Sequence, residues 1–363
     1  MRYLFAVVTM KDVATAAGVS PATVSNAFHG RPGRLSEAQR IRVLEVAAEL
    51  GYHGPDPAGR ALRTGVIGAI GAMFTESLSF AFDDASAVLL LKGISQIAEQ
   101  ADLTLSLLPF PPPTPDEDVA ARHERDAHVV RSSLVDRFLA YSMPDNHPAA
   151  ATAISRHLPT VVVDSPRHKG VHYVGIRDRQ SARQAAEHLI SLGHKRFGIL
   201  VDRLVPDGQS GFVTAARLRA TAEAVPRERL RGYRDALATA DIPWASIPIL
   251  EAGGLTVPLF DVAADMLLDT HYVTAILAVN DELALSVLRA CRRRGIAVPE
   301  ELSVVGFDDV PDAAPAGLTT VHQSFLEKGR VAAQLLTRDA SAVPKSILLP
   351  THFVERSSTG RPD

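Results

Sequence analysis

Residues 10–30 of the 363-residue chain read MKDVATAAGVSPATVSNAFHG, and they predict two short helices joined by a turn. Thr9 is placed to cap a first helix, and Asp12 three residues later completes a capping box. Gly18 ends this short helix, because glycine readily adopts the left-handed conformation found just past a helix end. The apolar residues at helical spacing, which we expect to face inward, are Val13, Ala14 and Ala17.

A second helix follows after a short turn. Ser20 is placed to cap it, and Pro21 occupies its first position, where a missing N–H group costs nothing. The residues expected on its inward face are Val24, Ala27 and Phe28. The residues expected on its outward face are Ala22, Thr23, Ser25 and Asn26.

A third helix is predicted over Glu37–Leu50, with Ser36 as its cap and Gly51 as its stop. We expect its inward face to consist of Ile41, Leu44, Val46 and Ala47. Three short helices with a glycine at the first turn are typical of a helix-turn-helix that reads DNA. The short hydroxyl and amide side chains of the second helix suit base edges and phosphates, and Asn pairs well with adenine. The alternative is a three-helix bundle that binds a protein.

Residues 10–63 resemble the DNA-binding headpiece of the LacI/GalR family of transcriptional regulators. The resemblance runs through KDVATAAGVSPATVSNAFHG, SEAQRIRVLEVAAELGY and PDPAGRALRTG. It implies that the second helix is the recognition helix and that Pro21, Ala22 and Asn26 select the base sequence. Many members carry Arg at the position of Asn26, so Asn26 shifts the expected base preference from guanine toward adenine. The residues expected at DNA are Thr9, Ser20, Pro21, Ala22, Thr23, Ser25, Asn26, His29, Gly59 and Leu62.

Residues 52–65 form a linker that is rich in proline and glycine. Pro57 is placed to start a helix of one or two turns, which is too short to be stable alone in water. The resemblance assigns Leu62 the role of an apolar wedge that enters the minor groove. The alternative is that Leu62 is an ordinary packing residue. Gly59 stands where relatives usually have Ala, which weakens this hinge helix by up to about 1 kcal/mol.

After Gly65 the sequence alternates between apolar strands and amphipathic helices, a pattern typical of parallel sheets covered by helices. About 290 residues exceed what one such sheet needs, so we expect two lobes. The predicted strands are 67–74, 103–108, 138–142, 160–163, 173–176, 197–201, 247–251, 275–279 and 303–307. The predicted helices are 87–100, 120–133, 181–192, 227–239, 257–270 and 281–294.

This region resembles the same family, most clearly in ILAVNDELALSVLRACRRRGIAVPEELSVVGFDD and LTTVHQSF. The resemblance implies a two-lobed fold like that of periplasmic sugar-binding proteins, with chain crossings near 175, 323 and 345. The expected division is a DNA-binding domain at 1–54, a hinge at 55–65, an effector-binding and dimerisation domain at 66–358 and a tail at 359–363. Within the effector-binding domain, lobe one is expected at 66–174 and 325–344, and lobe two at 175–323 and 345–358.

Ligands of such folds bind beyond the carboxyl ends of the strands. The polar candidates for effector contact are Thr75, Asn280 and Asp308 at strand ends, and Arg229 where the family often places a ligand-contacting arginine. These groups suit sugar hydroxyls. The alternatives are helix capping for Asn280 and Asp281, a turn for Asp308, and an ion pair of Arg229 with Glu228 or Asp235. Candidates for an apolar wall are Phe74, Phe80 and, as an effector contact, Phe82.

Composition excludes several classes of protein. Residues 1–65 hold eight basic and five acidic side chains, whereas the whole chain carries a net charge of −3, which favours a basic head on an acidic body. The single cysteine, Cys291, forms no internal disulfide. Tyr3–Val8 is too short for a signal peptide, and no apolar run is long enough to span a membrane, so we expect a cytoplasmic protein.

The sequence also lacks the motifs of common enzyme classes. The GQSG at 208–211 lacks the spacing of a nucleophile elbow, and no phosphate-binding or metal motif appears.

The sequence therefore predicts a homodimeric transcriptional regulator, most simply a repressor. Its expected partners are a palindromic operator and a sugar-like effector, with no cofactor, metal or membrane. One small headpiece makes few contacts, so pairs of headpieces are expected to read two-fold symmetric sites. The absence of a heptad helix at the chain end favours dimers over tetramers. The alternatives are a solute-binding protein that feeds a transporter and an enzyme with an attached DNA-binding head.

Overall fold

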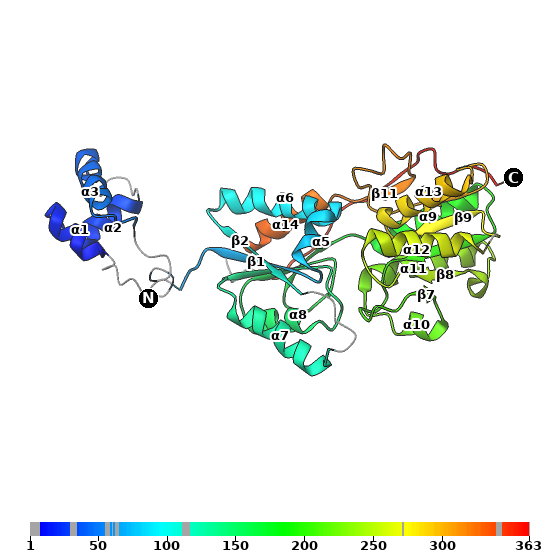
Figure 1. Cartoon of the computed structure of the whole chain (residues 1–363), viewed down its shortest axis with the longest axis horizontal. Helices are drawn as coiled ribbons and strands as arrows, with labels where there is room; N and C mark the ends of the chain where they lie inside the picture. The colour runs from blue at the N-terminus through cyan, green and yellow to red at the C-terminus, as the bar shows by residue number, and fades with distance from the viewer. Residues whose placement is uncertain are drawn as a thin grey trace. The chain divides into compact units, whose positions relative to one another are not determined.

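The computed structural model describes residues 8–29, 35–54, 59, 61, 65–110, 117–270, 272–338 and 343–362. The chain divides into two compact units, Met1–Ile67 and Gly68–Asp363. Figure 1 shows a small helical unit and a larger unit of sheets and helices. Within the described residues, no helix is both long and apolar enough to cross a lipid bilayer.

The first unit is built from α1 (Met10–Ala17), α2 (Pro21–His29) and α3 (Glu37–Glu49). Thr9 and Asp12 form the predicted capping box of α1, and Ser36 and Gln39 form a second one at α3. Gly18 has φ of 68°, the left-handed conformation that ends α1. The buried apolar residues of this unit are Val13, Ala14, Ala17, Val24, Ala27, Val43, Ala47 and Tyr52.

The predicted inner face of α3 is confirmed at Ala47 and half-buried at Leu44 and Val46, but it was wrong at Ile41 and omitted Val43. Ile41 is 47% exposed, whereas Val43 is 1% exposed and packs in the core four residues before Ala47. Residues four apart lie on the same face of a helix, so burial of Val43 and Ala47 turns Ile41 outward. Tyr52 completes the core, with its ring edge-on to Phe28 at a centroid distance of 5.5 Å.

The second unit holds a six-stranded parallel sheet in the order β12-β5-β4-β3-β1-β2. Its strands are β1 (Ala69–Phe74), β2 (Thr104–Pro109), β3 (Arg137–Tyr141), β4 (Thr160–Val163), β5 (His172–Gly175) and β12 (Ser346–Leu348). We call this sheet and its helices lobe one. The helices are α5 (Leu78–Asp83), α6 (Ala85–Gln100), α7 (Val119–Ser132), α8 (Pro148–Ser155) and α14 (Phe325–Leu336).

Lobe two holds a five-stranded sheet in the order β10-β9-β6-β8-β7, in which β7 is antiparallel. Its strands are β6 (Phe197–Val201), β7 (Gly211–Phe212), β8 (Ile249–Glu251), β9 (Ala275–Ala278) and β10 (Ser303–Val305). Its helices are α9 (Asp178–Ser191), α10 (Ala215–Arg219), α11 (Ala224–Thr239), α12 (Val257–Leu268), α13 (Asp281–Arg294) and the 3₁₀ turn η1 (Trp244–Ser246). A separate antiparallel pair is formed by β11 (Thr320–His322) and β13 (His352–Val354).

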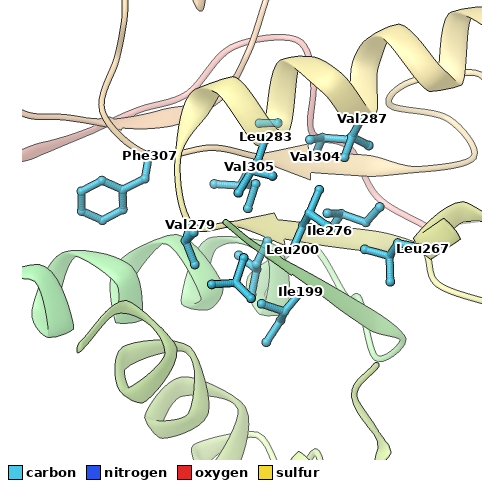
Figure 2. Packing of buried hydrophobic residues seen from close by; sticks show 14 of the residues in the cluster. Ile199, Leu200, Leu267, Ile276, Val279, Leu283, Val287, Val304, Val305 and Phe307 are labelled. Carbon is cyan, nitrogen blue, oxygen red and sulfur yellow. The ribbon is translucent and has the colours of Figure 1, made fainter. Parts of the chain in front are cut away.

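The alternation of buried strands and amphipathic helices thus produces the predicted α/β fold. Figure 2 shows the core of lobe two, where Ile199 and Leu200 of β6 and Ile276 of β9 lie among side chains of α12 and α13. All three side chains are fully buried. A parallel strand that is buried on both faces has apolar residues at successive positions. These strands could therefore be predicted from the sequence.

The sheets move one lobe boundary. Ile347 of β12 pairs with Val174 of β5, so lobe one continues to Leu348, and the predicted crossing near 345 lies a few residues too early. Strand β12 is short and largely exposed, and it lacks the apolar run that marks a buried strand. The residues predicted as a tail are also bonded to lobe two, because the Gly360 carbonyl lies 2.9 Å from His194 Nε2.

Helices α6 and α14 approach each other closely through two glycines. A Cβ built on Gly93 of α6 lies 2.1 Å from the Leu326 carbonyl oxygen of α14, and one built on Gly329 of α14 lies 2.2 Å from the Leu90 oxygen. Only glycine at these two positions allows α6 and α14 to pack at this distance. The contact fixes the returning segment of the chain, α14, onto lobe one.

Candidate functional site

A cavity of about 480 Å³ lies in the second unit. Its walls include the carboxyl ends of β1 and β3 in lobe one, and of β6, β9 and β10 in lobe two. This is the place where open α/β sheets bind ligands, because loops from several strands converge there. Four of the five predicted effector residues line it: Thr75, Arg229, Asn280 and Asp308.

Arg229 is the most constrained of these residues. Its Nε donates to Asp178 Oδ1 at 3.0 Å, and its Nη1 donates to Asp308 Oδ1 at 3.1 Å and to the Val279 carbonyl at 2.5 Å. The guanidinium also lies 3.7 Å from the centre of the Phe307 ring. Arg229 is therefore ion-paired as the alternative reading allowed, but with Asp178 and Asp308 and not with Glu228 or Asp235.

Asp308 faces the cavity from the end of β10. Burial raises the pKa of Asp308 to about 7, although the nearby Arg229 opposes this shift. The Asp308 Oδ1 atom accepts a hydrogen bond from Gln323 Nε2 at 2.5 Å. Its backbone has φ of 121° and that of Asp309 has φ of 57°, and Asp308 forms a β-bridge with His322 in place of the turn that the alternative predicted. Strained backbone of this kind is stabilised by its surroundings and is frequent at binding sites.

These contacts extend into a buried network that joins both lobes. The Gln323 side chain also accepts a hydrogen bond from Lys328 Nζ, and Lys328 pairs with Asp164 Oδ1 at 2.6 Å. Lys328 belongs to α14 of lobe one, whereas Asp308 belongs to lobe two. Gln323 lies in the segment that crosses between them. The network thus connects the cavity wall directly to a crossing segment.

Asn280 combines the two roles that the sequence left open. Its Oδ1 accepts from the Leu283 N–H at 2.9 Å and caps α13, while its Nδ2 donates to Asp202 Oδ2 at 3.1 Å on the cavity wall. Asp281 is not the cap of α13. It is fully buried and accepts from Thr320 Oγ1 at 2.6 Å, so it holds β11 against α13.

The apolar wall differs from the prediction at one residue. Phe74 and Phe80 line the cavity, but Phe82 is 60% exposed and is not on the wall. Phe80 and Phe82 both lie on α5, where residues two apart point to nearly opposite sides, so only one of them faces inward. The effector role predicted for Phe82 is therefore withdrawn. The other aromatic side chains on the wall are Tyr141, Phe260 and Phe325.

An ion-pair cluster that was not predicted from the sequence lies on the same wall. Arg203 follows β6 and is only 5% exposed. Its Nη1 lies 2.6 Å from Glu76 Oε1 of lobe one, and its Nη2 lies 2.8 Å from Glu223 Oε1. Burial raises the pKa of Glu223 to about 7. Arg203 and Glu76 each come just after a buried strand. Thr75 was predicted from the same kind of position, so this position could also have identified Arg203 and Glu76.

The first unit presents α2 as a candidate nucleic-acid interface. Ser20 Oγ accepts from the Thr23 N–H at 3.1 Å, as a cap does, and Pro21 and Ala22 are exposed. Thr23, Ser25 and Asn26 are half-buried. Thr9 is exposed, but its hydroxyl donates to Asp12 Oδ2 at 2.7 Å within the capping box.

The remaining predicted DNA contacts lie at the limits of the described residues. His29 ends α2, and Gly59 is helical and exposed. Leu62 and Pro57, to which the wedge and the hinge start were assigned, lie outside the described residues. The Gly65 N–H donates to the Ala61 carbonyl at 2.8 Å.

Comparison with known protein families gives two matches along the chain. Residues 9–55 match the bacterial regulatory proteins of the lacI family, and residues 186–359 match a periplasmic binding protein-like domain. The first match covers α1, α2 and α3, and the second covers most of lobe two and α14.

Individual proteins are similar over nearly the full chain. An HTH-type transcriptional regulator of Mycobacterium tuberculosis is 37% identical, over 98% of this chain and 97% of its own. The crystal structure of a LacI-family transcriptional regulator from Corynebacterium glutamicum is 32% identical, with a TM-score of 0.75 and 99% of both chains covered. The structure of the transcriptional regulator CelR in complex with cellobiose is 26% identical, with a TM-score of 0.67, covering 97% of this chain and 99% of that one.

Proposed function

This chain belongs to the lacI family of bacterial regulatory proteins, and we propose that it is a homodimeric repressor whose affinity for operator DNA is set by a small hydroxylated effector. Members of this family are transcriptional regulators and not enzymes. The repressor role, the effector and the dimer are the parts that we infer.

The proposed DNA contact is made by the amino-terminal part of α2. Pro21 and Ala22 are exposed at the start of this helix, the part that contacts base edges when a recognition helix lies in the major groove. Asn26 follows one turn later and supplies an amide for a base edge. Thr9, Ser20, Thr23 and Ser25 are proposed to contact phosphates or to orient the helix. His29, Gly59 and Leu62 are proposed to contact DNA at the end of α2 and in the hinge.

The single observation that supports an effector is the cavity at the strand ends. Aromatic side chains cover part of its wall, and Arg229, Asn280 and Asp308 present a fork of donors, an amide and a carboxylate. Such a mixture suits a sugar, which has an apolar ring face and a rim of hydroxyls. The similar regulator CelR was solved with cellobiose bound, which supports a sugar or a related polyol.

A second copy of this chain is the proposed occupant of an apolar face on α12. Leu259, Val262 and Met266 are 41%, 59% and 39% exposed and follow helical spacing, so they form one stripe. A small headpiece needs a two-fold partner to read an inverted repeat, which is the argument for a second copy. Val262→Asp is expected to convert a dimer into a monomer in sedimentation analysis, whereas Asp241→Asn, exposed elsewhere on lobe two, leaves it dimeric.

We propose that effector binding controls DNA binding because both depend on the same arrangement of the two lobes. A ligand that favours one arrangement of the lobes shifts their equilibrium and thereby changes DNA affinity by the same coupling free energy. We propose that the segments 176–177, 323–324 and 349–351, which connect the lobes, transmit this change to the hinge. An effector that releases DNA makes the protein an inducible repressor.

The test begins with selection of an operator from random duplex DNA by the purified protein. Binding of that operator is then measured by fluorescence anisotropy with and without sugars and polyols that raise the melting temperature. An inverted repeat that is released by one such compound supports the proposal. Binding without sequence preference favours a solute-binding protein, and turnover of the compound favours an enzyme.

A further inference from the structure

The cations on the cavity wall are already neutralised by the protein. Arg203 is paired with Glu76 and Glu223, and Arg229 is paired with Asp178 and Asp308. Among the described residues that line the cavity, these two are the only lysines or arginines. A negatively charged ligand would therefore find no free cation there, and it would have to break an existing ion pair to gain one.

Carboxylates on the same wall are not neutralised in this way. Asp202 accepts hydrogen bonds from the Arg203 N–H at 2.6 Å and from Asn280 Nδ2 at 3.1 Å. Asp84 accepts from the Ser86 N–H and hydroxyl at 3.0 and 2.8 Å. Neither carboxylate has an ion pair among the described residues. Both still have acceptor capacity, since an ionised carboxylate has about four lone-pair positions.

Glu282 of lobe two adds a third carboxylate to the cavity wall. It lies in the first turn of α13, lines the cavity and has neither a hydrogen bond nor an ion pair with any residue that the structure describes. Burial raises the pKa of Glu282, and the charge of Asp84 raises it further. Asp312 acts in the same direction, and Arg289 acts against it. Asp84 of lobe one and Glu282 of lobe two therefore place like charges on the wall of one cavity, where they repel each other.

From this charge pattern we propose that the effector carries no negative charge, and that Asp84 and Glu282 determine this selectivity by accepting hydrogen bonds from its hydroxyl or ammonium groups. This inference rests on the proposed function only in placing the effector in this cavity. A phosphate or carboxylate substituent would meet several carboxylates in a poorly solvated site, whereas a hydroxyl or ammonium group supplies the donors that they lack. Phosphorylation of a bound sugar is therefore expected to reduce its affinity.

The first test compares matched ligands. Sugars and polyols are titrated by calorimetry as the free compound, as the amine and as the phosphate ester, with wild type, Glu282→Gln and the exposed control Glu300→Gln. For any skeleton that binds, the phosphate ester is expected to bind at least tenfold more weakly than the free compound. Glu282→Gln is expected to reduce this ratio at least threefold, and Glu300→Gln to leave it unchanged. A phosphate ester that wild type binds as tightly as the free compound overturns the proposal. DNA is absent, so loss of operator binding does not affect the result.

The second test needs no ligand. Removing either member of a repelling pair stabilises a protein, and removing both gains less than the sum of the single effects. Asp84→Asn, which keeps a residue able to cap α6, and Glu282→Gln are each expected to raise Tm at pH 8 by about 2 °C. The rise is expected to become smaller as the pH is lowered, because protonation removes the negative charges that repel each other. No rise in either variant, or fully additive effects in the double variant, overturns the repulsion on which the selectivity depends.

Discussion

Arg203 Nη1 lies 2.6 Å from Glu76 Oε1, so that an ion pair joins the end of β6 in lobe two to the end of β1 in lobe one. Both side chains line the cavity. A second contact between the lobes is made by Arg227, whose Nη1 lies 2.7 Å from Asp145 Oδ2. Arg203 and Glu76 therefore belong both to the wall of the proposed effector site and to the connection between the lobes.

Replacing Arg203 leaves two carboxylates without their cation. Arg203→Met is expected to destabilise the second unit by about 3–5 kcal/mol at pH 8, because Glu76 and Glu223 remain in a poorly solvated site. The loss is expected to be smaller at pH 5, where Glu223, with its pKa of about 7, is protonated. Urea unfolding at both pH values measures this difference. Arg183→Met, in an exposed pair with Glu187, serves as the control and should cost less than about 1 kcal/mol.

The contact between α6 and α14 predicts a second effect on stability. Gly93→Ala places a methyl group against the Leu326 carbonyl, so the helices must separate, at a cost of about 1–3 kcal/mol. The exposed Glu99→Ala change on the same helix should have little effect. Urea midpoints that are equal for the two variants would show that the helices are not packed at this distance.

Effector affinity is expected to depend on the ionisation of Asp308. Burial raises the pKa of Asp308 to about 7, and a ligand hydroxyl that donates to it requires the carboxylate. The affinity for the effector should therefore rise as the pH rises through 7, by up to tenfold for each pH unit below 7.

The stability of the fold should change in the opposite direction. Because a raised pKa means that folding favours the protonated form, Asp308 contributes stability at low pH, and this stability is lost as the pH rises through 7. Calorimetric titration of the effector from pH 5.5 to 8.5 tests whether its affinity rises with pH. In Asp308→Asn, the affinity should change little over this pH range.

The recognition helix predicts a change of base preference. Asn26→Arg should replace an adenine contact with a guanine contact in each half-site, because Arg pairs with the O6 and N7 atoms of guanine. Selection from random DNA measures the preferred half-site of both proteins. Thr15→Ala, on the exposed side of α1, is the matched control. Identical half-sites for wild type and Asn26→Arg would exclude Asn26 from base readout.

The hinge can be tested although Leu62 lies outside the described residues. Leu62→Gly should weaken binding to the selected operator far more than binding to random DNA, because only the operator complex gains from a wedge in the minor groove. Equal losses on the two DNAs would remove this role. Anisotropy titrations at one fixed salt concentration are needed, since non-specific affinity depends strongly on salt.

Local signals in the sequence were sufficient for most of the fold. The caps Thr9 and Ser36 and the buried runs of β6 and β9 depend on neighbouring residues, and their patterns are direct. Strand β12 was missed because it is an exposed edge strand. Burial of Val43 in place of Ile41 depends on how three helices pack, which helical spacing alone does not fix.

The candidate site was predictable only in part. Strand-end positions identified Thr75, Asn280 and Asp308, because the carboxyl ends of parallel strands meet at one edge. The pairing of Arg203 with Glu76 joins residues that are 127 positions apart, and no local pattern reveals such a pair. The choice of Phe80 over Phe82 required the orientation of the short helix α5, which the sequence analysis did not predict.

We propose that α2 reads a two-fold symmetric DNA site and that the cavity controls this binding. Anisotropy titration of the full chain with its selected inverted repeat, with and without a compound that stabilises the protein, measures both properties together. We expect tight, sequence-dependent binding that the compound weakens at least tenfold. Binding that ignores sequence, or that is unchanged while the compound occupies the cavity, would contradict it.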